Sequence, residues 1–202
     1  MVIIQLLSAQ TAEQYQESAA MQFCGGLQEK TLRAAFYSTG VAEELSELLD
    51  AVLKNDKQNI IAEAGDVMWY FSQFLKENGI EMSKIIGEKN SDNDAGDAVD
   101  IESADAAADV TEKKHKIEVT NVDFSIVHLA FGKVFGKQKR LILGKVIAQE
   151  DLVKICSKAF STLEAFMENN YEVGMREVLV YNNKKLVDRI KREVIIGDGD
   201  YR

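Results

Sequence analysis

Apolar residues recur at helical spacing through most of the chain. Between residues 40 and 53 one stripe of apolar positions is formed by Val41, Leu45, Leu48 and Val52. Between residues 59 and 75 a second stripe is formed by Ile60, Ala64, Val67 and Phe71. At about 100° per residue, this spacing places each set on one face of a helix. The two stretches therefore predict two helices, and the few residues between them predict antiparallel packing.

Local end signals extend this pattern through the first part of the chain. Thr11 and Gln14 form a capping box that predicts a helix to about residue 23, and a further helical stretch covers 29–38. Asn55 and Asp56 predict a turn, in which Asp56 or Asn59 caps the following helix. Asn78-Gly79 predicts the end of that helix, and a short helix is expected over 82–86.

The apolar pattern stops at about residue 88 and resumes at Phe124. The intervening stretch is dominated by acids: Asp92, Asp94, Asp97, Asp100, Glu102, Asp105 and Asp109. It predicts a solvated connector, with a weak helix over 104–114. Beyond it, helices are expected over 124–148, 150–168 and 174–191, with Asn169-Asn170 separating the last two. We divide the chain into a first half (1–90), an acidic connector (91–122) and a second half (123–202).

A shift of 92 positions aligns the two halves without gaps. Five identities result: Gly40 with Gly132, Leu49 with Leu141, Phe74 with Phe166, Asn78 with Asn170, and Asn90 with Asn182. Any two amphipathic helices share an apolar stripe when brought into phase, so a duplication and an unrelated helical insertion both stay open.

Composition narrows the class of protein. The absence of proline among 202 residues favours uninterrupted helices, and 46% hydrophobic residues suffice for a core. The net charge of −9 argues against a nucleic-acid partner, although a nucleotide with bound Mg²⁺ is compatible with it. Cys24 and Cys156 are expected to be free thiols, and no apolar run is long enough for a membrane span. These features predict a cytoplasmic protein without a membrane partner.

Four acids form two matched pairs on the two central helices. Glu44 and Glu47 have the same offsets from Val41 that Glu63 and Asp66 have from Ile60. Antiparallel packing of the stripes would bring both pairs to one seam, where their mutual repulsion requires a cation. Oxygen ligands suit Mg²⁺ or Mn²⁺. The alternative is a pair of solvated helix edges.

These acids stand in a pattern that resembles the MazG-like nucleoside triphosphate pyrophosphohydrolases of the all-α NTP pyrophosphatase superfamily. The first motif is G-x-x-E-E-x-x-E followed by E-x-G-D, from Gly40 to Asp66. The second motif is Asn182-x-x-Lys185-Leu186-x-x-Arg189, followed by the tail Gly-Asp-Gly-Asp-Tyr-Arg at 197–202. The resemblance covers about 11–87 and 177–202 and leaves out the middle, where about ninety residues separate the motifs.

The resemblance implies an all-α, MazG-like four-helix bundle. With the shift of 92, it suggests a pseudo-dimer of two helical halves, in which the first half supplies acids and the second supplies basic groups. It implies Mg²⁺-dependent hydrolysis of a nucleoside triphosphate between the α and β phosphates, in nucleotide-pool housekeeping, by a homodimer. The alternatives are a non-catalytic helical binding module, or a related all-α hydrolase of dUTP or a phosphoribosyl nucleotide.

The resemblance also suggests roles for individual residues. The expected metal ligands are Glu44, Glu47, Glu63 and Asp66, with Glu43 positioning water. The expected substrate-binding residues are Asn182, Lys185, Arg189, Trp69, Tyr70 and Arg202. Lys185 and Arg189 share a helix face and suit phosphate oxygens, although cations are common near a helix C-terminus. Tyr70 lies on the flank of the acids and is a better base-stacking candidate than Trp69, although aromatic residues on helices more often belong to the core.

Overall fold

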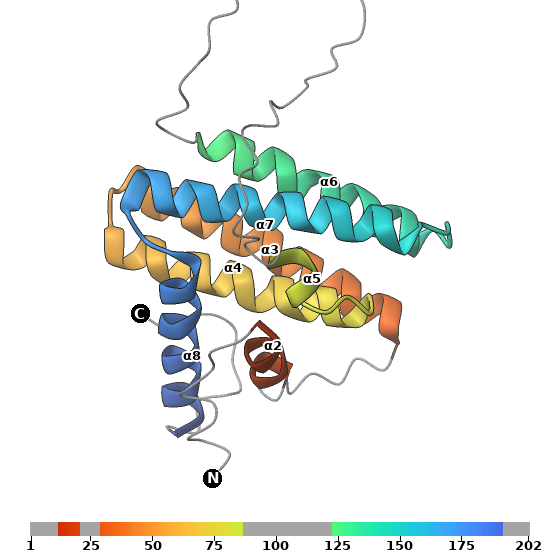
Figure 1. The fold of residues 1–202 in the computed structure, drawn as a ribbon, viewed down its shortest axis with the longest axis horizontal. Helices are drawn as coiled ribbons and strands as arrows, with labels where there is room; N and C mark the ends of the chain where they lie inside the picture. The colour runs from red at the N-terminus through yellow and green to blue at the C-terminus, as the bar shows by residue number, and fades with distance from the viewer. Residues whose placement is uncertain (1–11, 21–28, 87–122, 192–202) are drawn as a thin grey trace, which may run out of the picture.

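The computed structural model describes residues 12–20, 29–86 and 123–191, and all of its secondary structure in these ranges is helical (Figure 1). The helices are α2 (Ala12–Ala20), α3 (Lys30–Leu53), α4 (Lys57–Glu77), α5 (Ser83–Ile86), α6 (Phe124–Ile142), α7 (Gln149–Tyr171) and α8 (Met175–Lys191). The predicted all-α fold is confirmed. No helix in the described ranges is long and apolar enough to cross a membrane.

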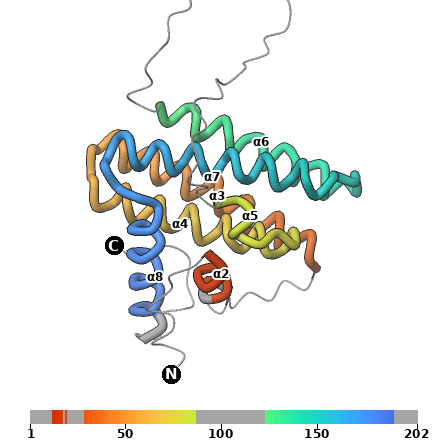
Figure 2. The backbone as a smooth tube through the Cα atoms, in the orientation of Figure 1, coloured from red at the N-terminus to blue at the C-terminus, as the bar shows by residue number. Residues whose placement is uncertain are grey.

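Two antiparallel helix pairs form the body of the molecule. Helices α3 and α4 make one pair, α6 and α7 make the other, and α3 also packs against α6 (Figure 2). One continuous core joins the pairs, and within it the rings of Phe71 and Phe131 meet edge to face at 5.2 Å. The apolar stripes predicted for α3 and α4 lie in this core, because burial of those side chains drives the packing.

Two further helices meet at α4. Helix α8 crosses α4 steeply, and α2 packs against both α4 and α8 (Figure 1). The short helix α5 packs on α7 instead. The last helix of the described residues therefore lies on the helix that carries Glu63 and Asp66.

The end signals of α4 are confirmed. Asp56 is its N-cap, and the Asp56 carboxylate accepts a hydrogen bond of 3.1 Å from the backbone N–H of Asn59. The helix ends at Asn78-Gly79, where Gly79 has the positive φ of 70° that glycine tolerates.

The predicted stretches 29–38 and 40–53 join into one helix, α3. Two other predicted boundaries are wrong. Helix α6 ends at Ile142 rather than 148, because Gly144 turns the chain with a φ of 72°. Helix α7 continues through Asn169-Asn170 to Tyr171 and ends only where Glu172 adopts a left-handed conformation.

Several predictions lie outside the described residues. They are the capping residue Thr11, the helix beyond residue 20, the acidic connector with its weak helix, and Arg202. The division into 1–90, 91–122 and 123–202 stays a prediction.

Candidate active site

The seam between α3 and α4 gathers three of the predicted acids. Carboxylate oxygens of Glu44, Glu63 and Asp66 all lie within 4.8 Å of one another. Each acid directly precedes a core residue on its helix (Leu45, Ala64 and Val67), so the packing of the apolar stripes turns the acids toward the same seam. Glu63 is only 2% exposed and Glu44 and Asp66 are half-buried, so water screens their mutual repulsion poorly.

The electrostatics of this acid cluster favour a bound cation. Burial, together with the charges of Asp66, Glu47 and Glu63 and against the opposing charge of Lys185, raises the pKa of Glu44 to about 8. A carboxyl group with such a pKa holds a proton at neutral pH unless another positive charge replaces it. Three converging carboxylates fit Mg²⁺ or Mn²⁺, which take oxygen ligands.

Helix α8 brings polar groups to the same cluster. The Asn182 side chain donates a hydrogen bond of 2.8 Å to one oxygen of Asp66, and the Lys185 ammonium forms an ion pair with the other. A Cβ atom at Gly65 would lie 2.7 Å from the Cβ of Asn182, so only glycine permits this close approach of α8 to α4. The two motifs, far apart in sequence, therefore meet at Asp66.

Tyr15 is a site residue that sequence reasoning missed. Its hydroxyl donates a hydrogen bond of 2.8 Å to the Asn182 side-chain oxygen, and the ring is 1% exposed. This bond orients the Asn182 amide so that its nitrogen faces Asp66. The sequence placed Tyr15 in a predicted helix but gave it no role at the site. Its partner Asn182 lies 167 positions away, so no local pattern could indicate the contact.

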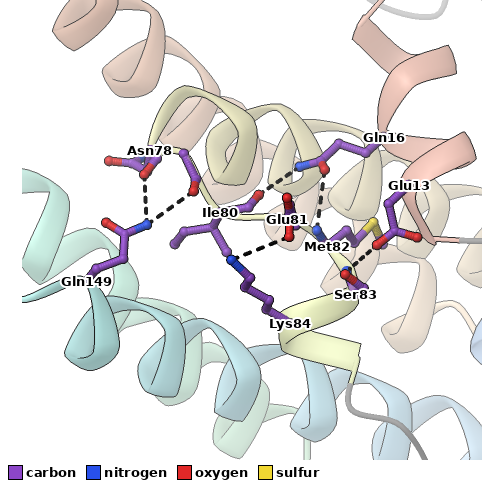
Figure 3. A network of polar contacts seen from close by, with 10 residues as sticks. Glu13, Gln16, Asn78, Ile80, Glu81, Met82, Ser83, Lys84 and Gln149 are labelled. Carbon is purple, nitrogen blue, oxygen red and sulfur yellow. Dashed lines mark hydrogen bonds and ion pairs between the residues drawn. The ribbon is translucent and has the colours of Figure 1, made fainter.

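A second polar network fixes α2 in place (Figure 3). The Gln16 amide nitrogen donates to the carbonyls of Ser72 and Ile80, and its oxygen accepts from the backbone N–H of Met82. The Glu13 carboxylate accepts a hydrogen bond of 3.0 Å from the backbone N–H of Ser83. Because Gln16 is buried, these bonds hold the helix that carries Tyr15 against α4 and the start of α5.

Tyr70 lies on one side of the acids. Its ring packs on Gly40, where an added Cβ would lie 2.2 Å from the ring. Burial raises the pKa of Tyr70 to about 12, with further contributions from Glu44, Glu43 and Asp66, whereas Arg189 lowers it. Tyr70 therefore senses the charges of the acids on α3 and α4 and of Arg189 on α8. Trp69 is half-buried against Tyr37 and Tyr70, with the two ring centroids at 6.3 and 4.7 Å.

Glu43 and Glu47 differ from the other acids. Both are exposed and line an open groove of about 530 Å³ beside Glu63, together with Ser46, Asp50 and Asn59. Glu47 acts on Glu44 through its charge, but its oxygens do not belong to the group that meets within 4.8 Å. The offsets on the two helices predicted four converging carboxylates, and the packing brings three together.

A comparison with protein families matches residues 5–93 to the model for phosphoribosyl-ATP pyrophosphohydrolase. This segment is less than half of the chain, contains the three clustered acids and Tyr15, and ends before α8. The first part of the chain is thus similar to an all-α pyrophosphohydrolase family related to the MazG-like enzymes, and the match is not to the MazG-like family itself. No curated protein and no solved structure matches the chain significantly.

Proposed function

We propose that this protein is a divalent-cation-dependent pyrophosphohydrolase that cleaves the triphosphate group of a nucleotide between its α and β phosphates. One observation carries the proposal: three carboxylates converge at the α3–α4 seam while Asn182 and Lys185 reach the same point from α8. The similarity of residues 5–93 to a pyrophosphohydrolase family supports the reaction type.

Glu44, Glu63 and Asp66 are the proposed ligands of Mg²⁺ or Mn²⁺. Bound there, the ion would neutralise charge on the phosphate oxygens and increase the acidity of water. It would also displace the proton that Glu44 otherwise retains, because the pKa of that carboxyl group is raised to about 8 in its absence. Asn182 holds Asp66 in one orientation, and Tyr15 in turn holds Asn182.

The remaining groups act on the substrate and on water. We assign Lys185 to a phosphate oxygen, because its ammonium already lies at the acid cluster. Arg189, on the Tyr70 side of α8, is assigned to the phosphate chain as well. Glu43 and Glu47 face the groove and are assigned to position the attacking water and accept its proton. The water oxygen attacks the α phosphorus, the bond from that phosphorus to the bridging oxygen breaks, and pyrophosphate leaves with the electron pair.

Two substrate classes share this reacting group. A nucleoside triphosphate fits the general resemblance of the motifs, and the matched family is named for phosphoribosyl-ATP, which carries the same triphosphate. Tyr70 is coupled electrostatically to Glu44, Glu43 and Asp66 and is only half-buried, so we assign it to the base or sugar of either substrate.

A substrate panel with product identification tests the proposal. The full chain would be incubated with Mg²⁺ and with ribonucleoside triphosphates, deoxynucleoside triphosphates including dUTP, or phosphoribosyl-ATP. We expect pyrophosphate and the corresponding monophosphate from at least one substrate, and no turnover in EDTA. Release of single phosphate groups, or no turnover of any substrate, would reject the proposed reaction. A sedimentation measurement on the same sample tests the predicted homodimer.

A further inference from the structure

Both carboxylate oxygens of Asp66 accept a bond from α8. The side-chain nitrogen of Asn182 donates to one oxygen at 2.8 Å, and the Lys185 ammonium bonds to the other. The two donors are three positions apart, so they leave the same side of their helix. Whichever oxygen of Asp66 a further ligand approaches, it meets one of these two donors.

Asn182 is a fixed donor. It is fully buried, and it packs so closely on Gly65 that an added Cβ atom there would lie 2.7 Å from the Asn182 Cβ. The Tyr15 hydroxyl donates to the oxygen of the Asn182 amide at 2.8 Å. Turning the amide over would set that oxygen against the carboxylate of Asp66, so the amide has one favourable orientation.

Lys185 is held by fewer contacts. Within the ranges that the structure describes, Asp66 is its one hydrogen-bond or ion-pair partner. Its charge also acts on Glu44, so the ammonium neutralises part of the acid cluster. Because this ammonium is carried on a flexible four-carbon stem, it can leave Asp66 without any movement of α8.

A divalent cation at the acids and the Lys185 ammonium make conflicting demands on Asp66. The Asn182 amide has no net charge and can share a carboxylate oxygen with a cation. The ammonium repels a cation on the same carboxylate, and water screens this repulsion poorly, because the side chains of Lys185 and Asp66 are only 19% and 13% exposed. A phosphate oxygen of the substrate would give the displaced ammonium a new anionic partner.

We propose that Lys185 exchanges partners: it neutralises the acid cluster until a divalent cation binds, and then turns to the phosphate chain of the substrate. Asn182, fixed by Tyr15, holds Asp66 throughout this exchange. The proposal rests on the proposed function, since Glu44, Glu63 and Asp66 must take the cation. It makes the cation and the phosphate chain support each other's binding, because both favour the arrangement in which Lys185 has left Asp66.

Titration of the full chain with Mn²⁺, without any phosphate, tests the first step of the exchange. Electron paramagnetic resonance measures the unbound ion. Lys185→Met keeps an apolar stem and removes the ammonium, so it should bind Mn²⁺ at least about fivefold more tightly than the wild type. The control Lys184→Met removes the same charge from an exposed neighbour and should bind like the wild type. Equal or weaker binding by Lys185→Met would overturn the proposal.

Glu63→Gln in the same titration separates this proposal from the proposed function. Loss of Mn²⁺ binding in Glu63→Gln, together with an unchanged affinity in Lys185→Met, would overturn the exchange and leave the metal site standing. Failure of all these proteins to bind Mn²⁺ would reject the metal site, and the exchange with it.

The second step predicts an effect of opposite sign in the same variant. At saturating Mn²⁺, calorimetry with α,β-methylene-ATP measures binding of a triphosphate that the proposed reaction cannot cleave. Lys185→Met should bind this probe about tenfold more weakly than the wild type, because a charge-assisted contact is lost, whereas Lys184→Met should not. A merely structural defect would weaken both Mn²⁺ and the probe. That result, or equal binding of the probe by Lys185→Met and the wild type, would overturn the proposal.

The fixed donor is tested through Tyr15. Tyr15→Phe should weaken Mn²⁺ binding about tenfold, the usual effect of losing a group that orients a metal ligand. Tyr171→Phe, which removes a hydroxyl from the end of α7, is the control and should not. In an Asn182→Ala background, Tyr15→Phe should have no further effect, because the amide that it orients is gone. Additive losses would overturn the role of Tyr15 as a positioning residue.

Discussion

The two helix pairs of this protein share one core and differ in the charge of the residues beside it. At the α3–α4 seam the carboxylates of Glu44, Glu63 and Asp66 converge, whereas α6 carries Lys133, Lys137, Lys139 and Arg140 outside its buried stripe. Both pairs bury an apolar stripe in the common core. The comparison shows that similar apolar stripes can pack helix pairs of opposite charge.

The largest effect in this comparison is expected from Glu63, the most buried of the three acids. Glu63→Gln should lower pyrophosphate release by about a thousandfold, because loss of one charge-stabilising group at a reaction centre has that magnitude. Helicity by circular dichroism should not change, since glutamine has the same size. The control is Glu168→Gln, an exposed site on α7. Retained activity in Glu63→Gln would remove this residue from the metal site.

Two glycines that the shift of 92 aligns, the buried Gly40 of α3 and the exposed Gly132 of α6, should respond in opposite directions to alanine. Gly40→Ala forces a methyl group into the Tyr70 ring, and overpacking of this kind costs about 1–3 kcal/mol of unfolding free energy. Gly132→Ala meets open space and should stabilise α6 by about 0.5–1 kcal/mol, because alanine loses less backbone entropy. Chemical denaturation measures both values. Equal responses would show that Gly40 does not serve the contact with Tyr70.

The contribution of the second half to the acid cluster is tested at Lys185. Lys185→Ala should lower kcat/KM by about 10- to 100-fold, since a hydrogen bond to a charged group contributes roughly 1.5–3 kcal/mol. Lys184→Ala is the control, because the neighbouring Lys184 is exposed. Wild-type kinetics in Lys185→Ala would show that α8 does not complete the site.

The acid cluster should make the metal-free protein less stable as the pH rises. Glu44 has a raised pKa of about 8 in the folded state, against the ordinary value of 4.5 in the unfolded chain, so the folded state retains a proton that the unfolded state releases. Its contribution is most favourable below pH 4.5 and is lost as the pH approaches 8. Between pH 5 and 8 in EDTA, the Tm should fall by roughly 2–5 °C more than in Glu44→Gln.

Mg²⁺ should reverse this fall in Tm. The increase in Tm should be larger at pH 8 than at pH 5, because the ion competes with the proton for the same carboxylate oxygens. Thermal unfolding with Mg²⁺ and in EDTA measures the difference. A pH profile of Glu44→Gln that coincides with that of the wild type would assign the titration to another group.

The smallest effect is expected at the starts of α4 and α7. Asp56 caps α4 through its side chain, whereas its counterpart Ala148 makes no such bond. Asp56→Ala should cost about 1 kcal/mol of unfolding free energy, and Ala148→Asp should return up to a similar amount to α7. Chemical denaturation of both variants tests whether the starts of α4 and α7 are equivalent. Destabilisation by Ala148→Asp would argue against that equivalence.

Much of the acid cluster was predictable because it arises from local spacing. The i, i+3 acids and the adjacent apolar stripes already indicated that Glu44, Glu63 and Asp66 would share a seam. Glu47 was expected to join them, because the acid pairs have equal offsets from Val41 and Ile60. That prediction assumed that both helices turn the same side toward the seam. The offsets ignore how the helices are rotated and shifted against each other, and this arrangement leaves Glu47 at the edge of an exposed groove.

The contacts of α8 and α2 were harder to predict. Asn182 and Lys185 were expected at the acids only through the family resemblance, and Tyr15 had no signal at all. Each depends on a close approach between distant segments, such as that of Gly65 and Asn182. The spacing of apolar residues describes one helix at a time. It contains no information on where two distant helices come close to each other.

The amino-acid sequence by itself determined the helices, most of their ends, and the placement of four acids beside two apolar stripes, because these follow from backbone geometry and the burial of apolar side chains. Only the tertiary structure decided which three acids meet and that α8 crosses α4 at Asp66. Electrostatic and hydrogen-bond interactions act over a few ångströms, so they are settled by the relative placement of whole helices and not by the pattern within any one of them.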